Sequence, residues 1–366
     1  MKLTWSECMY LHGLDAVKTR FSDCSSKLMI VGSGFDPRMT VGVSVLMQTT
    51  HNCSVLLVNY SEKQSVHNPV YTEERNRNVN KIKKMCGNRL SEINVEVWSR
   101  GIGATIVQKS MRSAINSELI STYDEIIVDI SAMPRIVSFN LIKQLLDLKK
   151  LSANSSKKMS ILVCENSSLD DGIKSIIGTE SPEFLPGLNS FVMDMEGTRA
   201  NPRVWFPILG LNEETTLQKI AKFLSPDETC PVLPFPSANV RREEEIVRRH
   251  GTELFTALEV EKRNIIYVPE NQPIIMYQKL CNTVSFYEIA LNPSPGDSEI
   301  SYIFSSQGSK IMDIGVLMAI IDLLRNGLTV GMAILENEGY DKSQAEYQPD
   351  NNELYCVCLD DNEYAW

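Results

Sequence analysis

Four stretches of this sequence combine hydroxyl, glycine and charged residues in a way that suits the binding of a small anion. In the first half they supply Ser33, Gly34, Asp36 and Arg38, and then Asp129, Ser131 and Arg135. In the second half they supply Asn212, Glu213 and Glu214, and then Ser305, Ser306, Gln307, Gly308, Ser309 and Lys310. Hydroxyl groups, backbone N–H groups and a cation together bind phosphate or carboxylate. Glycine lets the backbone approach a ligand closely, and lysine adds a point charge.

These stretches recur at nearly one spacing. Aligning the run around Gly34 with the run around Gly210 requires a shift of 176 residues, and aligning Arg135 with Lys310 requires a shift of 175. Solenoid repeats are much shorter, roughly 20–50 residues. The sequence therefore predicts two tandem copies of a whole domain, related by a pseudo-twofold axis.

Apolar runs alternate with helical patterns in both halves. In the first half we expect strands at 27–32, 55–58, 95–98, 125–130 and 159–164, with helices between them. In the second half we expect strands at 204–209, 231–235, 264–268, 300–304 and 329–335, and helices at 215–224, 241–250, 273–283 and 309–326. Nearly continuous apolar strands between helices indicate a parallel sheet that is covered on both faces. The fold class is therefore α/β, with two tandem Rossmann-like modules and mostly parallel sheets.

The same pattern sets the expected domain boundaries. Residues 1–26 read as an N-terminal helical extension, 27–165 as the first Rossmann-like domain and 203–366 as the second. Residues 166–202, rich in Ser, Gly, Pro and Asn, read as a connector. Because open α/β sheets bind ligands at the carboxyl ends of their strands, we expect the four stretches to form a site at that edge, between the two halves.

Several alternative sites are not supported by the motifs. Gly32-Ser33-Gly34 lacks the rest of a dinucleotide-binding GxGxxG, and the run before Lys310 lacks the first glycine of a Walker A loop. The four histidines and nine cysteines show no metal-ligand spacing, so we expect no metal and no cofactor. Cys356 and Cys358 alternate along a strand and are expected to be buried core thiols.

The charge and composition limit the class of partner. With 43% hydrophobic and 22% charged residues, the chain has the composition of a soluble globular protein. A net charge of −10 does not favour binding to polymeric nucleic acid, which usually requires a basic stripe. Arg75, Arg77, Lys81, Lys83 and Lys84 read as the solvated face of a surface helix. The start lacks the apolar core of a signal peptide and no run could span a bilayer, so we expect a cytoplasmic protein without membrane contact.

Two of these segments resemble CARF domains, the CRISPR-associated Rossmann folds. They are Tyr123–Ser131 and, more closely, the run from Ser305 through Gly308, Ser309 and Lys310 to Met312. CARF domains carry an acidic residue and Thr-Gly-Gly-Thr-Lys after an apolar strand; here the first copy has Ala132-Met133-Pro134-Arg135 and the second has Phe304 at the acidic position. Two fused copies resemble the SAVED branch of that superfamily. The resemblance implies sensing of a cyclic oligonucleotide in bacterial antiviral defence.

Three functions remain open from the sequence. The first is a regulatory protein that binds a nucleotide and signals to an effector or partner protein in a complex. The second is an enzyme that cleaves a nucleotide with the carboxylates of Asp36, Asp129, Glu213 and Glu214, if these converge. The third is a non-catalytic assembly subunit of a defence complex. Since no Ser/His or metal-hydrolase pattern is present, the first and third are favoured over the enzyme.

Overall fold

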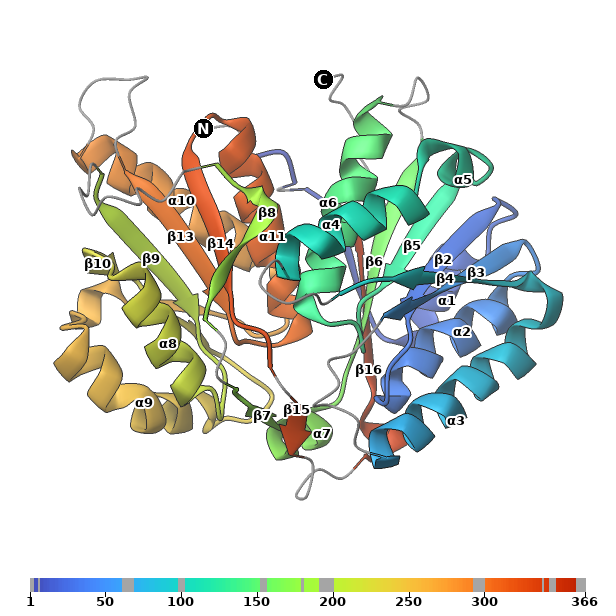
Figure 1. The fold of residues 1–366 in the computed structure, drawn as a ribbon, viewed down its shortest axis with the longest axis horizontal. Helices are drawn as coiled ribbons and strands as arrows, with labels where there is room; N and C mark the ends of the chain where they lie inside the picture. Colours follow the sequence, from blue (N-terminus) through green and yellow to red (C-terminus); the bar gives the residue numbers. More distant parts are fainter. Residues whose placement is uncertain are drawn as a thin grey trace. The chain divides into compact units, whose positions relative to one another are not determined.

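The computed structural model describes residues 3–5, 7–60, 69–97, 103–151, 157–178, 181–190, 201–291, 300–337, 339–341 and 347–359. The chain forms two compact units (Figure 1). The first-sheet unit comprises Glu7–Ser168 and Tyr347–Trp366, and the second-sheet unit comprises Met1–Ser6 and Leu169–Glu346. Among the described residues, no helix combines the length and the apolar character needed to cross a membrane.

The first-sheet unit is built on seven strands in the order β1-β16-β6-β5-β2-β3-β4. Five of them are parallel, from β6 to β4, whereas β16 and β1 are antiparallel to their neighbours. The strands are β1 (Met9–His12), β2 (Lys27–Gly32), β3 (Cys53–Tyr60), β4 (Leu90–Val95), β5 (Glu125–Asp129), β6 (Lys158–Glu165) and β16 (Glu353–Cys358). The central strand β2 is buried along its whole length, as its continuous apolar run predicts.

Helices cover both faces of this sheet, as Figure 1 shows. They are α1 (Leu14–Phe21), α2 (Val41–Thr49), α3 (Pro69–Cys86), α4 (Gly103–Ala114), α5 (Ser117–Ser121) and α6 (Arg135–Leu151). The short α7 (Ser167–Gly172) follows β6, and the boundary between the two units falls within it. Helix α2 contacts both α1 and α3, and Phe21, Leu46 and Ile82 from these helices share a core with β2 and β3. Helices α4 and α6 contact each other and form a separate group.

The second-sheet unit contains a sheet in the order β12-β11-β9-β13-β14-β8, with the short β10 also paired to β9. Its strands are β8 (Glu183–Asn189), β9 (Arg203–Ile208), β10 (Glu228–Thr229), β11 (Val232–Pro234), β12 (Ile266–Val268), β13 (Ser301–Ser306) and β14 (Thr329–Ile334). All pairs are parallel except β14 with β8. The helices are α8 (Glu214–Leu224), α9 (Arg242–Thr252), α10 (Pro273–Leu291) and α11 (Lys310–Arg325). A further pair, β7 (Lys174–Ile176) with β15 (Gly339–Asp341), forms a separate two-stranded sheet.

The two large sheets have the same strand order. If the parallel strands of each sheet, apart from the short β10, are numbered along the chain, both sheets read third, second, first, fourth, fifth. Each sheet is extended beyond the fifth strand by an antiparallel one. The antiparallel strand is exchanged: β8 follows β6 in the chain but pairs with β14, whereas β16 follows β14 but pairs with β6. The protein is therefore an α/β protein with two mostly parallel, Rossmann-like sheets, and its order of strands agrees with an internal duplication.

This exchange corrects the expected domain boundaries. The segment 347–359, assigned from sequence to the second domain, belongs to the first-sheet unit, because β16 pairs along its length with β6. The expected helical extension, 1–26, contains β1 and α1, and β1 joins the first sheet. The expected connector, 166–202, contains α7, β7 and β8 in its described part. Strand pairing between distant segments sets these boundaries, and local composition does not report it.

The remaining differences concern element ends. The third strand of the first sheet is Leu90–Val95 rather than 95–98, of which residue 98 lies outside the described part. It is an edge strand with few buried positions, so its apolar signal is weak. Cys356 and Cys358 are buried on one face of β16, as expected, with their sulfurs 4.0 Å apart.

Candidate functional site

The loop after β2, at the carboxyl edge of the first sheet, contains an ion pair between Asp36 and Arg38. The Nη2 atom of Arg38 lies 2.6 Å from Oδ2 of Asp36, and both residues are buried. Asp36 also accepts a hydrogen bond from the backbone N–H of Arg38 at 2.9 Å, which caps the short 3₁₀ helix at Pro37–Thr40. The two residues expected to bind a ligand therefore satisfy each other.

Asp129, at the end of β5, is completely enclosed. Its Oδ1 accepts hydrogen bonds from the backbone N–H and the hydroxyl of Ser131, and the Ser131 hydroxyl accepts one from the N–H of Cys164 at 2.8 Å. Burial raises the pKa of the Asp129 carboxyl to about 7, with a further increase from Asp36, while Ser131 and Arg38 act in the opposite direction. Oδ2 has no hydrogen-bond partner among the described residues and faces Gly42, where a Cβ would lie 2.3 Å away.

Side chains of α3 form hydrogen bonds with the loop after β2. Arg75 donates to the hydroxyl of Ser33 at 3.0 Å, and Asn78 donates to the carbonyl oxygen of Gly34 at 3.2 Å. Arg75 was expected on a solvated face; it is instead partly buried, because it reaches back over the carboxyl end of β2. A Cβ on Gly34 would lie 3.2 Å from the Tyr60 hydroxyl, so little space remains there.

A C-terminal segment also belongs to this edge. Asn166, which follows β6, donates to the carbonyl oxygen of Gln348 at 2.9 Å and to Oδ1 of Asn352 at 2.8 Å. Burial raises the pKa of the Tyr347 hydroxyl, to which Cys164 and Asp36 contribute. The carboxyl edge of the first sheet is thus occupied by side chains of the protein itself.

The corresponding edge of the second sheet brings two strand ends into close contact. Gly210 follows β9, and a Cβ at this position would lie 1.9 Å from the carbonyl oxygen of Gln307, which follows β13. A Cβ on Gly308 would lie 2.8 Å from Cγ2 of Ile208. Position 210 requires glycine because the backbone of Gln307 lies against it, and position 308 leaves no room for a Cβ beside the side chain of Ile208.

His250 completes this contact from α9. Its Nε2 lies 3.0 Å from the carbonyl oxygen of Gly210, and the residue is 2% exposed. Asn78 makes the same contact with Gly34 in the first-sheet unit, also from the helix that follows the second parallel strand. The sequence did not indicate either residue, since each contact joins positions far apart in the chain.

Three buried polar atoms around Gly210 and Gln307 lack hydrogen-bond partners within the described part of the chain. They are Nδ1 of His250, Oε1 of Gln307 and Oγ of Ser309. Ser309 is the N-cap of α11 without a side-chain capping bond, and Lys310 is the first residue of that helix. A buried polar atom without a partner costs free energy unless water or a ligand completes it.

The other serines near this position already have partners. Ser305 accepts a hydrogen bond from Nε1 of Trp205 at 3.0 Å, and Ser306 donates to the buried carboxylate of Asp313. Lys310 and Arg135 occupy equivalent positions, since each begins the helix after the fourth parallel strand of its sheet. The structure thus gathers Gly308, Ser309 and Lys310 at the N-terminus of α11, where the helix dipole favours an anion.

The remaining expected residues of this half form their own contacts. Asn212 has a left-handed backbone, with φ 62°, and accepts a hydrogen bond from Arg249. Glu213 accepts from Ser175 at 2.6 Å and from Thr216 at 2.7 Å.

Oε1 of Glu214 lies 3.6 Å from Nη1 of Arg249. Asp36, Asp129, Glu213 and Glu214, the four carboxylates of the cleavage hypothesis, each have a described partner.

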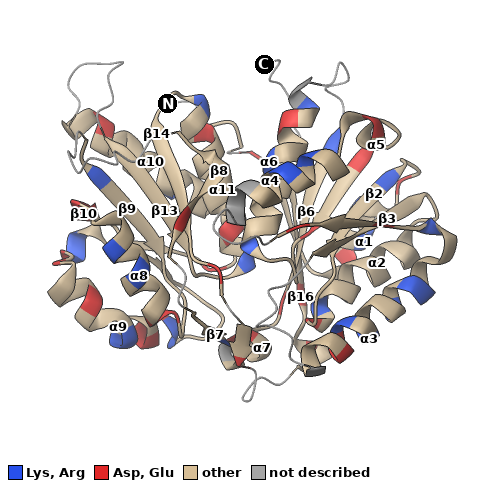
Figure 2. Ribbon diagram, viewed as in Figure 1, with Lys and Arg blue, Asp and Glu red and all other residues tan. Residues whose placement is uncertain are grey.

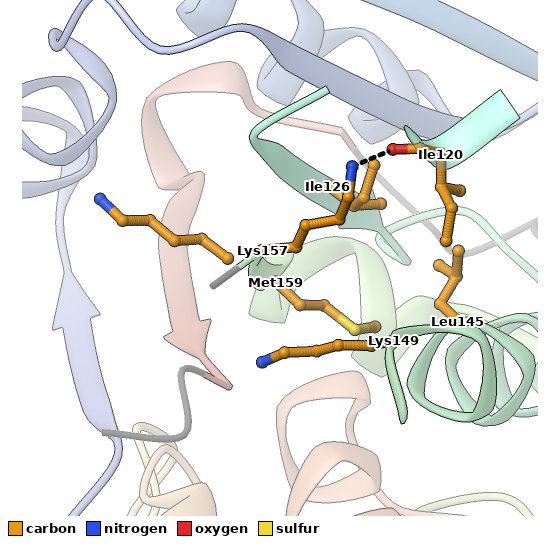
Figure 3. A pocket seen from close by; sticks show the side chains of 7 residues that line it. Ile120, Ile126, Leu145, Lys149, Lys157 and Met159 are labelled. Carbon is orange, nitrogen blue, oxygen red and sulfur yellow. Dashed lines mark hydrogen bonds between the residues drawn. The ribbon is translucent and has the colours of Figure 1, made fainter. Parts of the chain in front are cut away.

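A shallow hollow lies elsewhere, between the amino ends of β5 and β6 and the helices α5 and α6 (Figure 3). Its volume is about 250 Å³, counted with the solvent at its mouth, and Ile126, Leu145 and Met159 line it. Lys157 donates to the carbonyl oxygens of Ile120, Ser121 and Tyr123 at 2.6–2.9 Å. This lysine therefore caps the C-terminus of α5. The hollow lies at the amino edge of the first sheet, opposite to the carboxyl edge where the ligand loops were expected.

Charged groups are mixed on the surface helices. Figure 2 shows Lys and Arg interspersed with Asp and Glu along α3, α8 and α9. Among the described residues, no group of three or more His, Cys, Asp or Glu side chains has the arrangement of a metal site.

No family model and no curated protein sequence matches this chain. Solved structures match most of its length at low similarity. A protein described as a UDP-N-acetylglucosamine 2-epimerase from Listeria monocytogenes is 11% identical, with a TM-score of 0.24 over 84% of this chain and 79% of its own. An uncharacterized protein from Mycobacterium paratuberculosis is 8% identical, with a TM-score of 0.23 over 90% and 92%.

UGT2 from Phytolacca americana, in complex with UDP-2-fluoro-glucose and pterostilbene, is 11% identical, with a TM-score of 0.25 over 86% of this chain and 81% of its own. Likenesses at this level carry no argument about a ligand or a reaction.

Proposed function

We propose that this protein is a regulatory protein that binds a small anionic ligand, a nucleotide, at the carboxyl edge of its second sheet and transmits that event to a partner protein. The observation that supports this proposal is that three buried side-chain atoms at this edge, Nδ1 of His250, Oε1 of Gln307 and Oγ of Ser309, have no hydrogen-bond partner among the described residues, and that Ser309 is the N-cap of α11. The phosphate lies at the N-terminus of α11, within reach of Ser309 and Lys310.

The comparison between the two edges favours the second one. At the first edge the expected ligand groups are already used: Asp36 pairs with Arg38, Ser131 with Asp129, and Ser33 with Arg75. At the second edge, the run Gly308-Ser309-Lys310 that resembles CARF domains contains the Ser309 hydroxyl, which is buried and has no hydrogen-bond partner among the described residues. Cyclic oligonucleotides therefore belong among the ligands to be examined.

A thermal-shift screen tests this proposal. The purified chain is heated with inorganic phosphate, mono- and dinucleotides and cyclic oligonucleotides. A ligand at 100 times its dissociation constant stabilises the native state by about 2.7 kcal/mol, which is well measurable. A shift with one class identifies the ligand, and the absence of a shift with all of them contradicts the proposal.

Two variants locate the site. Lys310→Ala removes the cation at the start of α11 and is expected to weaken binding about tenfold, as for a hydrogen bond to a charged group. Lys222→Ala removes an exposed lysine in the last turn of α8 and is expected to leave the affinity unchanged. Equal affinities for Lys310→Ala and wild type would place the ligand elsewhere.

A further inference from the structure

The hydrogen bond between His250 and Gly210 fixes the chemical character of the other imidazole nitrogen. A carbonyl oxygen can only accept, so Nε2, 3.0 Å from the Gly210 oxygen, must carry the proton. In the neutral ring, Nδ1 then holds a lone pair and can only accept. This nitrogen is buried and has no partner among the described residues.

A second buried acceptor without a partner among the described residues belongs to a residue that contacts Gly210. Oε1 of Gln307 is a carbonyl-type oxygen, and Gln307 is 8% exposed. His250 and Gln307 both contact Gly210, His250 through the Gly210 carbonyl and Gln307 through its own backbone. A phosphate group offers oxygen acceptors and few donors, so phosphate alone would leave both atoms unsatisfied.

We infer that the ligand carries a free hydroxyl group beside its phosphate, as a ribonucleotide does, and that Nδ1 of His250 and Oε1 of Gln307 accept hydrogen bonds from the sugar hydroxyls. This inference rests on the proposed function and specifies its ligand. Gln307 and Ser309 are separated by one residue, so the donor must lie within a few ångströms of the phosphate at the start of α11. Sugar hydroxyls meet that condition, whereas the amino group of a base lies farther from the phosphate.

The test compares adenosine 5′-monophosphate with its 2′-deoxy and 3′-deoxy forms and with inorganic phosphate, by isothermal titration at pH 8. In the wild type, removal of the recognised hydroxyl is expected to weaken binding about three- to tenfold, the value of one neutral hydrogen bond. The base amine is examined with inosine 5′-monophosphate, which lacks it. A loss of affinity with that probe and with neither deoxy form overturns the inference.

The decisive variant is His250→Gln. A glutamine amide can keep the N–H donor to the Gly210 oxygen and has no acceptor at the position of Nδ1; circular dichroism verifies that the fold is retained. This variant is expected to lose the preference for the hydroxyl that Nδ1 accepts and to keep the preference for a hydroxyl that Oε1 of Gln307 accepts. The control is His51→Gln, which replaces an exposed histidine in the first-sheet unit and should preserve the wild-type preference.

The two proposals fail in different ways. If all three adenosine nucleotides bind equally to wild type, while Lys310→Ala weakens all of them, the hydroxyl inference is wrong and the anion site stands. If neither the nucleotides nor phosphate bind, both are wrong.

Discussion

Gly210 and Gln307 touch through their main chains, at the ends of two adjacent parallel strands. A Cβ at position 210 would lie 1.9 Å from the Gln307 carbonyl oxygen, closer than any packed atom can come. This contact holds together the groups on which the proposed ligand site depends: His250 binds the Gly210 carbonyl, and Ser309 lies two residues beyond Gln307.

The first prediction concerns Gly210→Ala. The added methyl group must displace the backbone of Gln307, so we expect a loss of about 1–3 kcal/mol in unfolding free energy, as for overpacking, together with weaker ligand binding. Gly251→Ala is the control. A Cβ there would meet Phe255 at 3.9 Å, an ordinary contact, and helix propensity predicts a gain of up to about 1 kcal/mol. Urea denaturation of both variants distinguishes these outcomes, and equal effects would contradict the close contact.

The second prediction concerns the pH dependence due to Asp129. Its pKa in the folded protein is about 7, above the ordinary value of 3.8, so the folded state holds a proton that the unfolded state releases. The resulting stabilisation is complete below pH 4 and is lost as pH rises to 7, by at most about 1.4 kcal/mol per pH unit. Asp129→Asn removes the titrating group. We therefore expect the unfolding free energy of the wild type to fall more steeply between pH 5 and 7 than that of the variant; parallel curves would show that Asp129 does not titrate there.

The third prediction concerns the buried pair at the first edge. Asp36→Ala leaves the guanidinium of Arg38, which is 5% exposed, without its carboxylate. Breaking a buried pair in this way costs about 3 kcal/mol. Glu92→Ala breaks an exposed ion pair in which Nζ of Lys83 lies 2.8 Å from Oε1 of Glu92. This change should lower the unfolding free energy by less than about 1 kcal/mol. Chemical denaturation gives both values, and comparable losses would mean that the Asp36 pair is solvated.

The fourth prediction concerns the exchanged strand β16. Leu354 is 4% exposed and pairs with Cys164 of β6, so Leu354→Ala is expected to cost about 2–5 kcal/mol. The loss should be confined to the first-sheet unit and appear as faster amide hydrogen exchange in β6. Asp350→Ala, an exposed change on the same C-terminal segment, serves as the control. Unchanged exchange in β6 for Leu354→Ala would contradict the pairing.

Much of the fold was predictable because its signals are local. The apolar run at 27–32 reads as a buried strand and forms one, and the helix after Pro134 begins at Arg135. Lys310 begins the equivalent helix of the second unit, so the two residues that the sequence alignment matched, Arg135 and Lys310, are each the first residue of their helix. These outcomes depend on hydrophobic periodicity and helix starts, which neighbouring residues determine.

Contacts between distant residues were not predictable in this way. Arg75 reads as a solvated helix residue but reaches Ser33, 42 positions away, and His250 meets Gly210 across 40 positions. The place of β16 beside β6 depends on strand pairing across about half of the chain. The sequence by itself determined most of the parallel strands and the helices between them, their order and the α/β class. Only the tertiary structure decided which polar groups satisfy one another and which, such as Nδ1 of His250, have no partner in the described part of the chain, because burial and hydrogen-bond partners are set by packing rather than by local sequence.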